Sequence, residues 1–314
     1  MKSPELADLQ AARERIAPYV HHTPVLCSQQ LDGHTGAELF FKCEHLQRAG
    51  AFKARGATNA VLCLDATEAV AGVATHSSGN HGAALAMAAG QRDLPAYIVM
   101  PTNAPTVKRA AVAGYGGEII ECEPTLAARE ATLATVLKKT GAVAVHPYND
   151  PRIIAGQGTA ALELMEQVPN LDVIVVPVGG GGLLAGTALA AKGLNSRIEV
   201  VAVEPEGADD AFRSFGLGEL QPQTNPNTIA DGLRAGLGEL NFEIIRKHVD
   251  TILTVPDSVI VEAMKLQWTR MKQVVEPSGA VGFAGVLEHP ERFRGRRVGL
   301  VVSGGNVDID NLPW

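Results

Sequence analysis

The sequence predicts an α/β protein with mainly parallel sheets and helices on both sheet faces. Short apolar segments alternate with helical segments of about ten to fifteen residues, which is the pattern of repeated βα units. The run Val173–Val178 contains no polar residue, as expected for a strand buried on both faces of a parallel sheet. Glycine-rich segments follow several predicted strands, and ligands bind at that edge of open α/β sheets.

The length of 314 residues favours two domains or one large one. Two series of βα units separate near residues 148–151. We therefore expect a small mobile domain at 72–149, and a large domain formed by 1–71 together with 150–314. A cleft should lie between them.

Composition excludes several classes of protein. The net charge is −7, aromatic residues make up 4%, and no basic cluster is present, which argues against nucleic-acid binding. No apolar run has membrane-spanning length, and the polar first ten residues resemble no targeting segment. The four cysteines form no CxxC pair, so we expect small buried side chains in a reducing, cytoplasmic setting.

In the first half of the chain, Leu6, Leu9, Ala12 and Ile16 recur at helical spacing, which predicts a helix to about Tyr19 with Ser3 as its N-cap. Further helices are predicted at 52–64, 80–90, 106–113 and 126–139. Strands are predicted at 38–43, 73–76, 96–100, 118–121 and 142–146.

In the second half, the same patterns predict alternating helices and strands up to the last buried strand. Helices are predicted at 155–167, 183–192 and 258–271. Strands are predicted at 173–178, 199–203 and 298–302. The segment 216–227 is rich in Gly, Pro, Gln and Asn, which indicates a loop.

Lys53 lies in a stretch of small residues, 51–57, directly after Phe52. A lysine held in an apolar pocket can lose its proton near neutral pH and act as a nucleophile or base. An ordinary solvated lysine can occur in the same stretch. The interpretation therefore depends on four other segments.

The first segment, Ser77 to Gly82, joins a predicted strand to a predicted helix. A helix N-terminus offers free N–H groups and a positive dipole, so Ser77, Ser78, Asn80 and His81 suit a carboxylate or phosphate. A simple N-cap formed by Ser78 or Asn80 is the alternative.

The second segment is Gly179, Gly180, Gly181 and Gly182, followed by Leu183, between a buried strand and a helix. Four glycines let the backbone approach an anion and direct several N–H groups at it. The segment matches neither GxGxxG nor a P-loop, so a phosphate monoester fits better than a nucleoside triphosphate. A tight turn without a ligand is the alternative.

The third and fourth segments also follow strands. Ser303 could exchange one hydrogen bond with a ring nitrogen, unless its segment is only a turn. The carboxylates of Glu204 and Asp210, with the Ala208 carbonyl, could bind a hard cation, although an acidic solvated loop has the same composition. A nucleophilic lysine, a phosphate loop, a carboxylate-binding loop and a serine for a ring nitrogen are the parts that a pyridoxal phosphate site requires.

The sequence resembles the serine/threonine dehydratase and serine racemase family of fold type II pyridoxal phosphate enzymes. The resemblance runs nearly end to end, and the similarity to serine racemase extends to that enzyme's divalent-cation site, at Glu204-Pro205 and 208–210. The other matching motifs are 22–25, 77–82, 146–147, 154–159, 179–182, 230–232, 276–277 and 303–308.

This resemblance implies a two-lobed, tryptophan synthase β-like fold whose large domain binds the cofactor. Lys53 would carry pyridoxal phosphate, and Gly179–Leu183 would hold its phosphate. Further residues implied to contact the cofactor are Phe52 at the ring, Asn80 at the 3-hydroxyl, Ser303 at the pyridine nitrogen, and Glu276.

The resemblance also implies the substrate contacts. Ser77, Ser78, Asn80 and His81 would receive the substrate carboxylate, with Ser78 facing Cα opposite Lys53. Arg129 would approach the substrate from the small domain. A divalent cation, magnesium or calcium, would bind Glu204, Ala208 and Asp210.

Three positions depart from the family pattern. Ala49 and Ala51 replace a threonine and a serine that usually precede the Phe-Lys pair, which bears on substrate choice more than on cofactor chemistry. Tyr148 stands where racemase-like proteins often have asparagine.

The resemblance implies a dehydratase that converts an L-β-hydroxy amino acid of the serine or threonine type to a 2-oxo acid and ammonia. Serine or aspartate racemisation is the alternative activity, and 3-hydroxyaspartate and phenylserine are alternative substrates. A catalytically silent ligand-binding regulator would be expected to lack Lys53 or the glycine loop. We also expect a homodimer.

Overall fold

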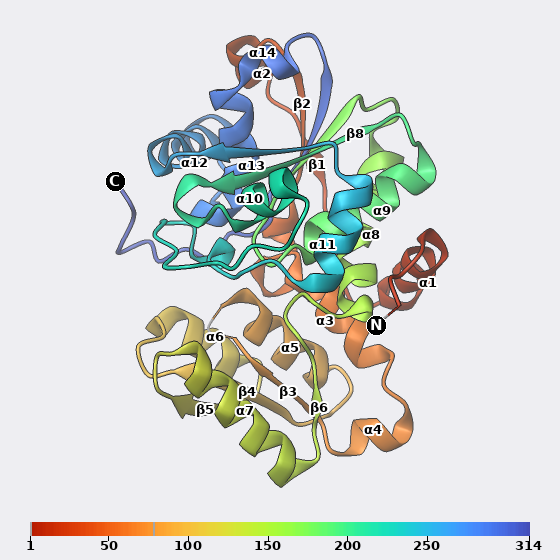
Figure 1. Ribbon diagram of the computed structural model, residues 1–314, viewed down its shortest axis with the longest axis vertical. Helices are drawn as coiled ribbons and strands as arrows, with labels where there is room; N and C mark the ends of the chain where they lie inside the picture. The colour runs from red at the N-terminus through yellow and green to blue at the C-terminus, as the bar shows by residue number, and fades with distance from the viewer. Residues whose placement is uncertain (1, 78) are drawn as a thin grey trace.

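The computed structural model describes residues 2–77 and 79–314. The chain forms two sheets, each with its own helices, and these make an upper and a lower lobe in Figure 1. The upper lobe contains both the start and the end of the chain. The predicted α/β class, with mainly parallel sheets covered by helices, is confirmed.

The upper lobe is built on a six-stranded sheet of order β1-β2-β10-β7-β8-β9. Only the β1–β2 pair is antiparallel. The last strand lies between β2 and β7, so residues from both ends of the chain share the centre of the sheet. The strands are β1 (Val25–Leu26), β2 (Glu38–Lys42), β7 (Val173–Pro177), β8 (Glu199–Pro205), β9 (Thr251–Val255) and β10 (Arg297–Val301).

Alternate residues of the central strands enter different hydrophobic cores. Val173 and Val175 of β7 belong to the core that contains α12 and α13, whereas Ile174 and Val176 belong to the core that contains α9 and α11. This alternation explains the continuous apolar run, because both faces of the strand are covered. The helices of this lobe are α1 (Leu6–Ile16), α2 (Gln29–Thr35), α8 (Pro151–Gln167), α9 (Gly182–Leu194), α10 (Asp210–Leu217), α11 (Glu239–His248), α12 (Asp257–Met271), α13 (Pro277–Glu288) and α14 (Pro290–Phe293).

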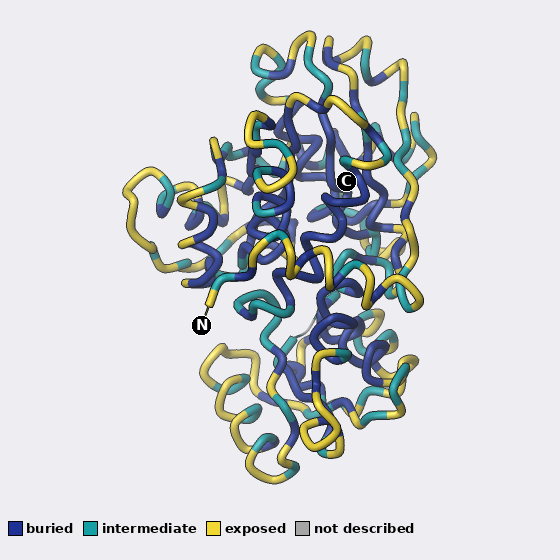
Figure 2. Tube along the Cα trace, turned by 90° about the vertical axis from the view of Figure 1, so that its right-hand side faces the viewer, coloured by how far each residue is buried: buried dark blue, intermediate teal, exposed yellow. Residues whose placement is uncertain are grey.

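The lower lobe contains a parallel four-stranded sheet of order β5-β4-β3-β6. Its strands are β3 (Val73–His76), β4 (Ala96–Pro101), β5 (Glu118–Cys122) and β6 (Val143–Ala144). Its helices are α4 (Ala66–Val70), α5 (Asn80–Gly90), α6 (Thr106–Gly114) and α7 (Leu126–Thr140). Figure 2 shows exposed and intermediate segments around a buried centre in this lobe.

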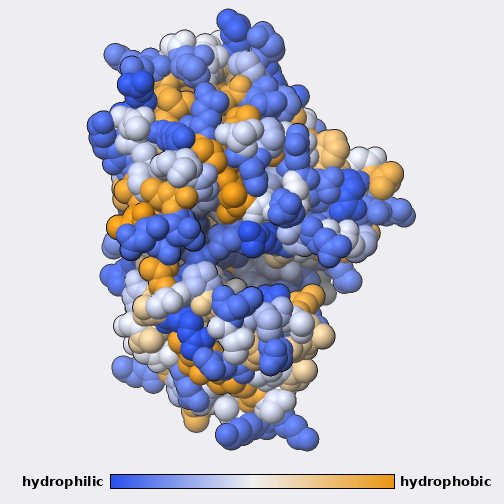
Figure 3. Space-filling view, turned by 90° about the vertical axis from the view of Figure 1, so that its left-hand side faces the viewer, coloured by the Kyte–Doolittle hydropathy of each residue, from blue (hydrophilic) through white to orange (hydrophobic). Residues whose placement is uncertain are grey.

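Helix α3 (Lys53–Leu62) contacts α8 of the upper lobe and α5 of the lower lobe, so it joins the two. In Figure 3 the molecular surface is hollowed between the lobes. Four short 3₁₀ helices complete the described structure: η1 (Glu44–Leu46), η2 (Arg48–Gly50), η3 (Glu206–Ala208) and η4 (Asp231–Leu233). No helix within the described ranges is both long and apolar enough to span a bilayer.

The structure corrects several local predictions. Helix α1 is capped by Glu5 rather than Ser3, because the side chains of Glu5 and Asp8 bond each other's backbone N–H, and it ends at Ile16. Of the cysteines predicted to be buried, Cys27 and Cys63 are exposed. Helix α10 extends to Leu217, into the segment predicted as a loop.

Candidate active site

Lys53 is the first residue of α3, at the junction of the lobes. Its Nζ donates a hydrogen bond of 2.8 Å to the Pro147 carbonyl oxygen. Burial lowers the pKa of Lys53 to about 8, since a charged ammonium is poorly solvated there. A substantial fraction of this amine is therefore neutral near physiological pH, as a nucleophile or base requires.

The backbone before Lys53 is tied to the segment that follows β10. The Phe52 N–H donates to the Ser303 carbonyl at 3.0 Å, and Ala51 forms an isolated β-bridge with Gly304. The Gly305 N–H donates to the Gly50 carbonyl at 3.0 Å. These bonds place Ser303 beside Phe52 and Lys53.

The turn before Lys53 has an unusual backbone. Ala49 has φ 55° and Gly50 has φ 68°, both in the left-handed region. Only glycine fits at position 50, because a Cβ there would lie 2.2 Å from Asn306 Oδ1. Asn306 Nδ2 in turn donates to the Ala49 carbonyl at 2.7 Å. Strained backbone of this kind is typical of functional sites.

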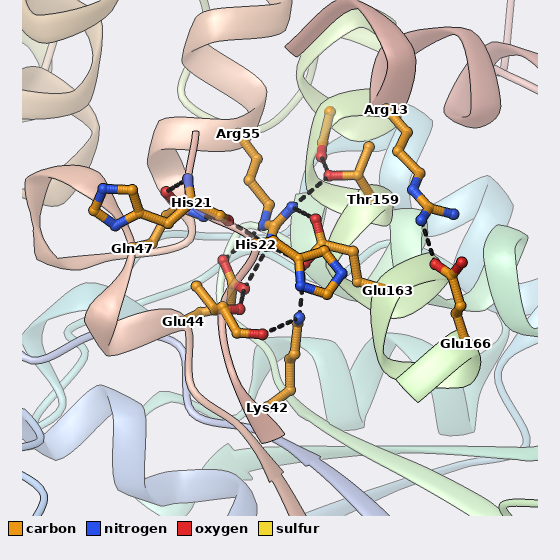
Figure 4. Close-up of polar contacts among 12 residues, drawn as sticks. Arg13, His21, His22, Lys42, Glu44, Gln47, Arg55, Thr159, Glu163 and Glu166 are labelled. Carbon is orange, nitrogen blue, oxygen red and sulfur yellow. Dashed lines mark hydrogen bonds and ion pairs between the residues drawn. The ribbon is translucent and has the colours of Figure 1, made fainter. Parts of the chain in front are cut away.

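A buried ion cluster anchors α3 two residues after Lys53 (Figure 4). The guanidinium of Arg55, which is fully buried, makes two hydrogen bonds to Glu44 and two to Glu163, at 2.7–2.8 Å. Lys42 Nζ donates to Glu163 at 2.7 Å, so two cations face two carboxylates. Burial lowers the pKa of Arg55, but Glu44 and Glu163 raise it more, so the guanidinium stays charged. This cluster fixes the start of α3 relative to β2 and α8.

The glycine loop lies between β7 and α9, as predicted. Gly181 has φ 89°, and a Cβ there would lie 2.6 Å from Leu237 Cδ1. Among the described residues, none accepts a hydrogen bond from the N–H groups of Gly180, Gly181, Gly182 or Leu183. Free donors of this kind at a helix N-terminus are suited to binding a phosphate group.

Ser303 is buried close to the start of α13, where its Oγ donates to the Ser278 carbonyl at 3.3 Å. Nearby, Asn80 Nδ2 donates to Glu276 Oε1 at 2.7 Å, and Asn306 Nδ2 donates to Asn80 Oδ1 at 3.0 Å. Burial and then the charge of Asp231 raise the pKa of Glu276 to about 7. Asn80, Glu276 and Asn306 therefore form one hydrogen-bonded group, and Ser303 bonds separately to the start of α13, which follows Glu276.

The serine-rich loop precedes α5. Ser77 Oγ accepts a hydrogen bond from the Gly79 N–H at 3.3 Å, and Ser78 lies outside the described residues. His81 is buried, with Nε2 3.3 Å from the Val145 carbonyl oxygen and no partner for Nδ1 within the described chain. Burial and then the charge of Lys53 lower the pKa of His81 well below its ordinary value, so this imidazole is neutral.

Arg129 lies on α7 and is partly exposed, with Nε 3.4 Å from the Thr125 carbonyl oxygen. Its charge lowers the pKa of His76, at the end of β3, in addition to the larger effect of burial. Arg129 is therefore a cation beside the strand that leads into the serine loop.

Two buried carboxylates lie close together in the sequence, Glu204 near the end of β8 and Asp210 at the start of α10. Glu204 accepts hydrogen bonds from the Ala211 and Phe212 N–H groups, and Asp210 accepts from the Leu237 N–H and from Gln223 Nε2. Burial raises the pKa of Glu204 to about 9 and that of Asp210 to about 6. The described chain contains no group of three or more His, Cys, Asp or Glu side chains arranged as a metal site. A cation here would need the Ala208 carbonyl and water in addition to the two carboxylates.

Sequence patterns did not indicate three parts of this site: the Pro147 carbonyl that contacts Lys53, Ser278 beside Ser303, and Asn241. Asn241 Nδ2 donates to the Gly180 carbonyl at 2.6 Å and to the Tyr148 carbonyl at 3.2 Å. All three contacts join residues far apart in the chain, for which a local pattern carries no signal.

The arrangement fits pyridoxal phosphate. A neutral amine at Lys53, unpaired N–H groups at the glycine loop and a serine hydroxyl at Ser303 supply groups for its aldehyde, phosphate and ring nitrogen.

The proteins to which this chain is similar belong to a family that uses the same cofactor. The family model described as pyridoxal-phosphate dependent enzyme matches residues 16–304. A beta-hydroxyaspartate dehydratase of Paracoccus denitrificans is 52% identical over 314 residues, covering 100% of both chains. A serine racemase of Arabidopsis thaliana is 51% identical, covering 98% of this chain and 95% of its own.

Solved structures give the same result. The structure of maize serine racemase superimposes with a TM-score of 0.97 at 48% identity, covering 98% of this chain and 95% of that one. The chain belongs to the pyridoxal-phosphate dependent enzyme family, and the predicted family and fold are confirmed.

Proposed function

We propose that this pyridoxal-phosphate dependent enzyme is a carbon–nitrogen lyase that converts an L-β-hydroxy amino acid to a 2-oxo acid and ammonia, with 3-hydroxyaspartate as its preferred substrate. The observation that carries the proposal is the position of Lys53. Its amine has a pKa lowered to about 8. It bonds the carbonyl of Pro147, next to the Tyr148 ring that packs on the glycine loop, and its charge lowers the pKa of His81 at the start of α5.

Most groups that would hold the cofactor belong to the large lobe. The N–H groups of Gly179 to Leu183 would bind the phosphate, Ser303 would bond the pyridine nitrogen, and Phe52 would contact the ring. From the small lobe, Asn80, held by Glu276, would bond the 3-hydroxyl. When bound, pyridoxal phosphate withdraws electrons from the attached amino acid and so acidifies its Cα–H bond.

The protein then supplies the bases and the orientation. The Lys53 amine takes the proton from Cα, and a lowered pKa keeps enough of the amine neutral for this step. The neighbouring histidines do not compete for that proton, because burial lowers the pKa of His146 to about 4 and that of His81 well below normal. Release of the β-hydroxyl as water gives the unsaturated product, which hydrolyses to the 2-oxo acid and ammonia.

The substrate carboxylate would bind at the N-terminus of α5, beside Ser77, Asn80 and His81, and Ser78 is proposed to contribute as well. Arg129 supports the choice of a dicarboxylic substrate, since it adds a cation at the small-lobe side of the cleft. Two relatives point the same way by name: the Paracoccus dehydratase and the Saccharomyces cerevisiae L-threo-3-hydroxyaspartate ammonia-lyase, which is 47% identical over 307 residues.

Racemisation of serine or aspartate is a second candidate activity, favoured by serine racemase relatives at 44–51% identity. It would use Lys53 on one face of Cα and Ser78 on the other. It differs from elimination only in the return of the proton before the β-substituent leaves.

A substrate panel tests the proposal. The purified holoenzyme is incubated with both 3-hydroxyaspartate diastereomers, L-serine, D-serine, L-threonine, phenylserine and L-aspartate, and both 2-oxo acid formation and inversion at Cα are measured. We expect the highest kcat/KM for 2-oxo acid formation from a 3-hydroxyaspartate isomer. Inversion without 2-oxo acid from every substrate would instead identify a racemase.

Arg129 offers a matched variant for the same panel. Arg129→Gln should raise KM for 3-hydroxyaspartate about tenfold or more and change KM for L-serine less, because one charge-assisted contact is lost only with the dicarboxylate. Equal effects on both substrates would show that Arg129 holds the carboxylate they share.

A divalent cation, magnesium or calcium, is proposed at Glu204, Asp210 and the Ala208 carbonyl. Support comes from the burial of both carboxylates. Within the described chain neither forms an ion pair with a buried Lys or Arg, and the nearby Arg213 pairs with Asp209. EDTA should lower the melting temperature and added magnesium should restore it, since a ligand that binds only the folded state stabilises it. No change in wild type, or the same change in Glu204→Gln, would contradict this site.

Three predictions from the sequence remain proposals. The segment 72–149 would move as a small domain against 1–71 and 150–314, and a homodimer would form. The first can be tested by small-angle scattering with and without substrate, and the second by sedimentation. A cytoplasmic location stays a prediction.

A further inference from the structure

Tyr148 lies in the candidate active site, and the proposed function gives it no role. Its aromatic ring packs against the backbone of the glycine loop, because a Cβ on Gly180 would lie only 2.4 Å from Tyr148 Cγ and Cδ1. A Cβ on Gly182 would lie 3.1 Å from the Tyr148 carbonyl oxygen. The absence of side chains at these two glycines thus gives room for Tyr148 as well as for a phosphate group.

The segment that carries Tyr148 is held from three sides. His146 Nδ1 accepts hydrogen bonds from the Tyr148 and Asn149 N–H groups, at 3.2 and 2.8 Å. Asn241 Nδ2 bonds both the Tyr148 and the Gly180 carbonyl oxygens. The adjacent Pro147 carbonyl accepts the bond from Lys53 Nζ. Tyr148 is therefore fixed between the Lys53 amine and the proposed phosphate site.

The phenol group itself is available to a ligand. His146 packs edge-on against the ring, with centroids 4.5 Å apart, and no described residue forms a hydrogen bond with the phenolic oxygen. Burial and then the charges of Asp210 and Glu130 raise the pKa of Tyr148, while Arg129 opposes this rise. The phenol is thus protonated at neutral pH and can donate.

We propose that Tyr148 is the catalytic acid that protonates the β-hydroxyl as it leaves, an assignment that rests on the proposed lyase function. The Lys53 amine takes the Cα proton, and the electron pair of that bond forms the Cα–Cβ double bond. The Cβ–O bond breaks with its electron pair on oxygen, which accepts the phenolic proton and departs as water. The phenolate then regains a proton from the Lys53 ammonium through solvent, so both groups return to their starting states.

Other groups near Lys53 are less suited to this role. His146 is neutral, because burial lowers its pKa to about 4, and its Nδ1 already accepts two backbone hydrogen bonds. Glu276 is engaged by Asn80, in the group of residues around Ser303. Tyr148 is the acid that the fold places on the glycine-loop side of the cleft.

Leaving-group chemistry tests the assignment. The variant Tyr148→Phe keeps the ring that packs on Gly180 and removes only the hydroxyl. Wild type and variant are compared on 3-hydroxyaspartate and 3-chloroaspartate of the same configuration, which yield the same 2-oxo acid. Chloride needs no proton to depart, so the variant should lose about 10²-fold in kcat with the hydroxy substrate and stay within about twofold with the chloro substrate.

Two further measurements separate catalysis from structure. The apoprotein of Tyr148→Phe, titrated with pyridoxal phosphate and followed by absorbance, should bind it with wild-type affinity, and its melting temperature should be unchanged. Tyr115→Phe, at an exposed position on the lower lobe, should behave as wild type throughout.

The outcomes are distinct. Equal losses with both substrates, or no loss with either, would overturn the role of Tyr148 while leaving the lyase function in place. A wild-type enzyme that forms 2-oxo acid from neither substrate would overturn the proposed function itself.

Discussion

The central strands β7, β8 and β10 of the six-stranded sheet are covered on both faces, whereas the four-stranded sheet ends in β5, most of whose residues are exposed or half-buried. The lower lobe also has an exposed helix, α7, which buries Val136 among mainly exposed side chains. By contrast, α9 of the upper lobe and α5 of the lower lobe are buried along nearly their whole length. The glycine loop, Ser303 and the acidic segment belong to the first lobe, and the serine loop and Arg129 to the second. The fold thus puts most groups proposed to hold the cofactor on the upper lobe, and puts the groups proposed to meet the substrate, together with Asn80, on the lower lobe.

The largest expected effect is on activity, at Lys53, where the two lobes meet. Lys53→Ala should lower activity by about 10³-fold or more, since a base and the attachment point of the cofactor are lost together. The visible absorption of the bound cofactor should disappear as well. Lys53→Arg, which keeps a cation but not a nucleophilic amine, is the control and should be equally inactive. Retained turnover in either variant would refute the mechanism.

The next largest expected effect is on stability, when the buried ion cluster around Arg55 is broken. Arg55→Met leaves Glu44 and Glu163 buried with Lys42 as their only cationic partner, which should cost about 3–5 kcal/mol in the free energy of unfolding. Urea denaturation measures this cost. Arg13→Met removes the neighbouring, more exposed pair with Glu166 shown in Figure 4 and should cost less than about 1 kcal/mol. Similar costs would mean that the buried cluster does not anchor α3.

Core packing should distinguish the lobes directly. Leu300→Ala, in the centre of the six-stranded sheet, should destabilise the protein by about 2–5 kcal/mol, because it removes a fully packed side chain. Leu126→Ala, at the exposed start of α7, should change stability by less than about 0.5 kcal/mol. Both values come from urea denaturation followed by fluorescence. A large effect at Leu126 would indicate that this face of the lower lobe is covered in solution.

The smallest effect concerns an ion pair between the lobes. Lys108 of α6 pairs with Asp231 of η4, and Lys108→Ala should change global stability by less than about 1 kcal/mol. If the lower lobe moves as proposed, the same variant should accelerate hydrogen exchange in α6 and α7. Arg109→Ala, which removes the pair with Glu121 inside the lower lobe, should not affect exchange at the lobe boundary. Equal exchange in both variants would argue against a latch between the lobes.

Much of this fold and site could be predicted because the signals are local. The apolar run of β7 followed by four glycines and a helix predicted both the strand and the loop, since glycine clusters at strand ends have few structural alternatives. The start of α5 at Asn80 and the strand Val73–His76 also match the structure residue by residue. Matches of this kind occur where one short segment determines its own conformation.

The remaining features depend on contacts between distant residues. Helix α13 is rich in glycine and alanine, so its sequence gave little helical signal, yet it is buried against the sheet. The contact of Tyr148 with Gly180 depends on how the segment after β6 packs on the large lobe, and the contacts of Arg55 with Glu44 and Glu163 join three separate elements. Cys27 and Cys63 were expected to be buried from their residue type alone, which does not determine which side of an element faces solvent.

The position of β10 between β2 and β7 has a consequence for how the protein is made. Residues 297–301 must leave the ribosome before the central part of the sheet can close, and the backbone bonds from Ser303 and Gly305 to the Lys53 segment form only after that. Domains usually fold as units during synthesis, beginning with the N-terminal part of the chain. Here the lower lobe can fold while the chain is still growing, but the Lys53 pocket cannot. A nascent chain stalled before residue 297 should therefore be unable to capture the cofactor, whereas one that has released β10 from the ribosome should capture it.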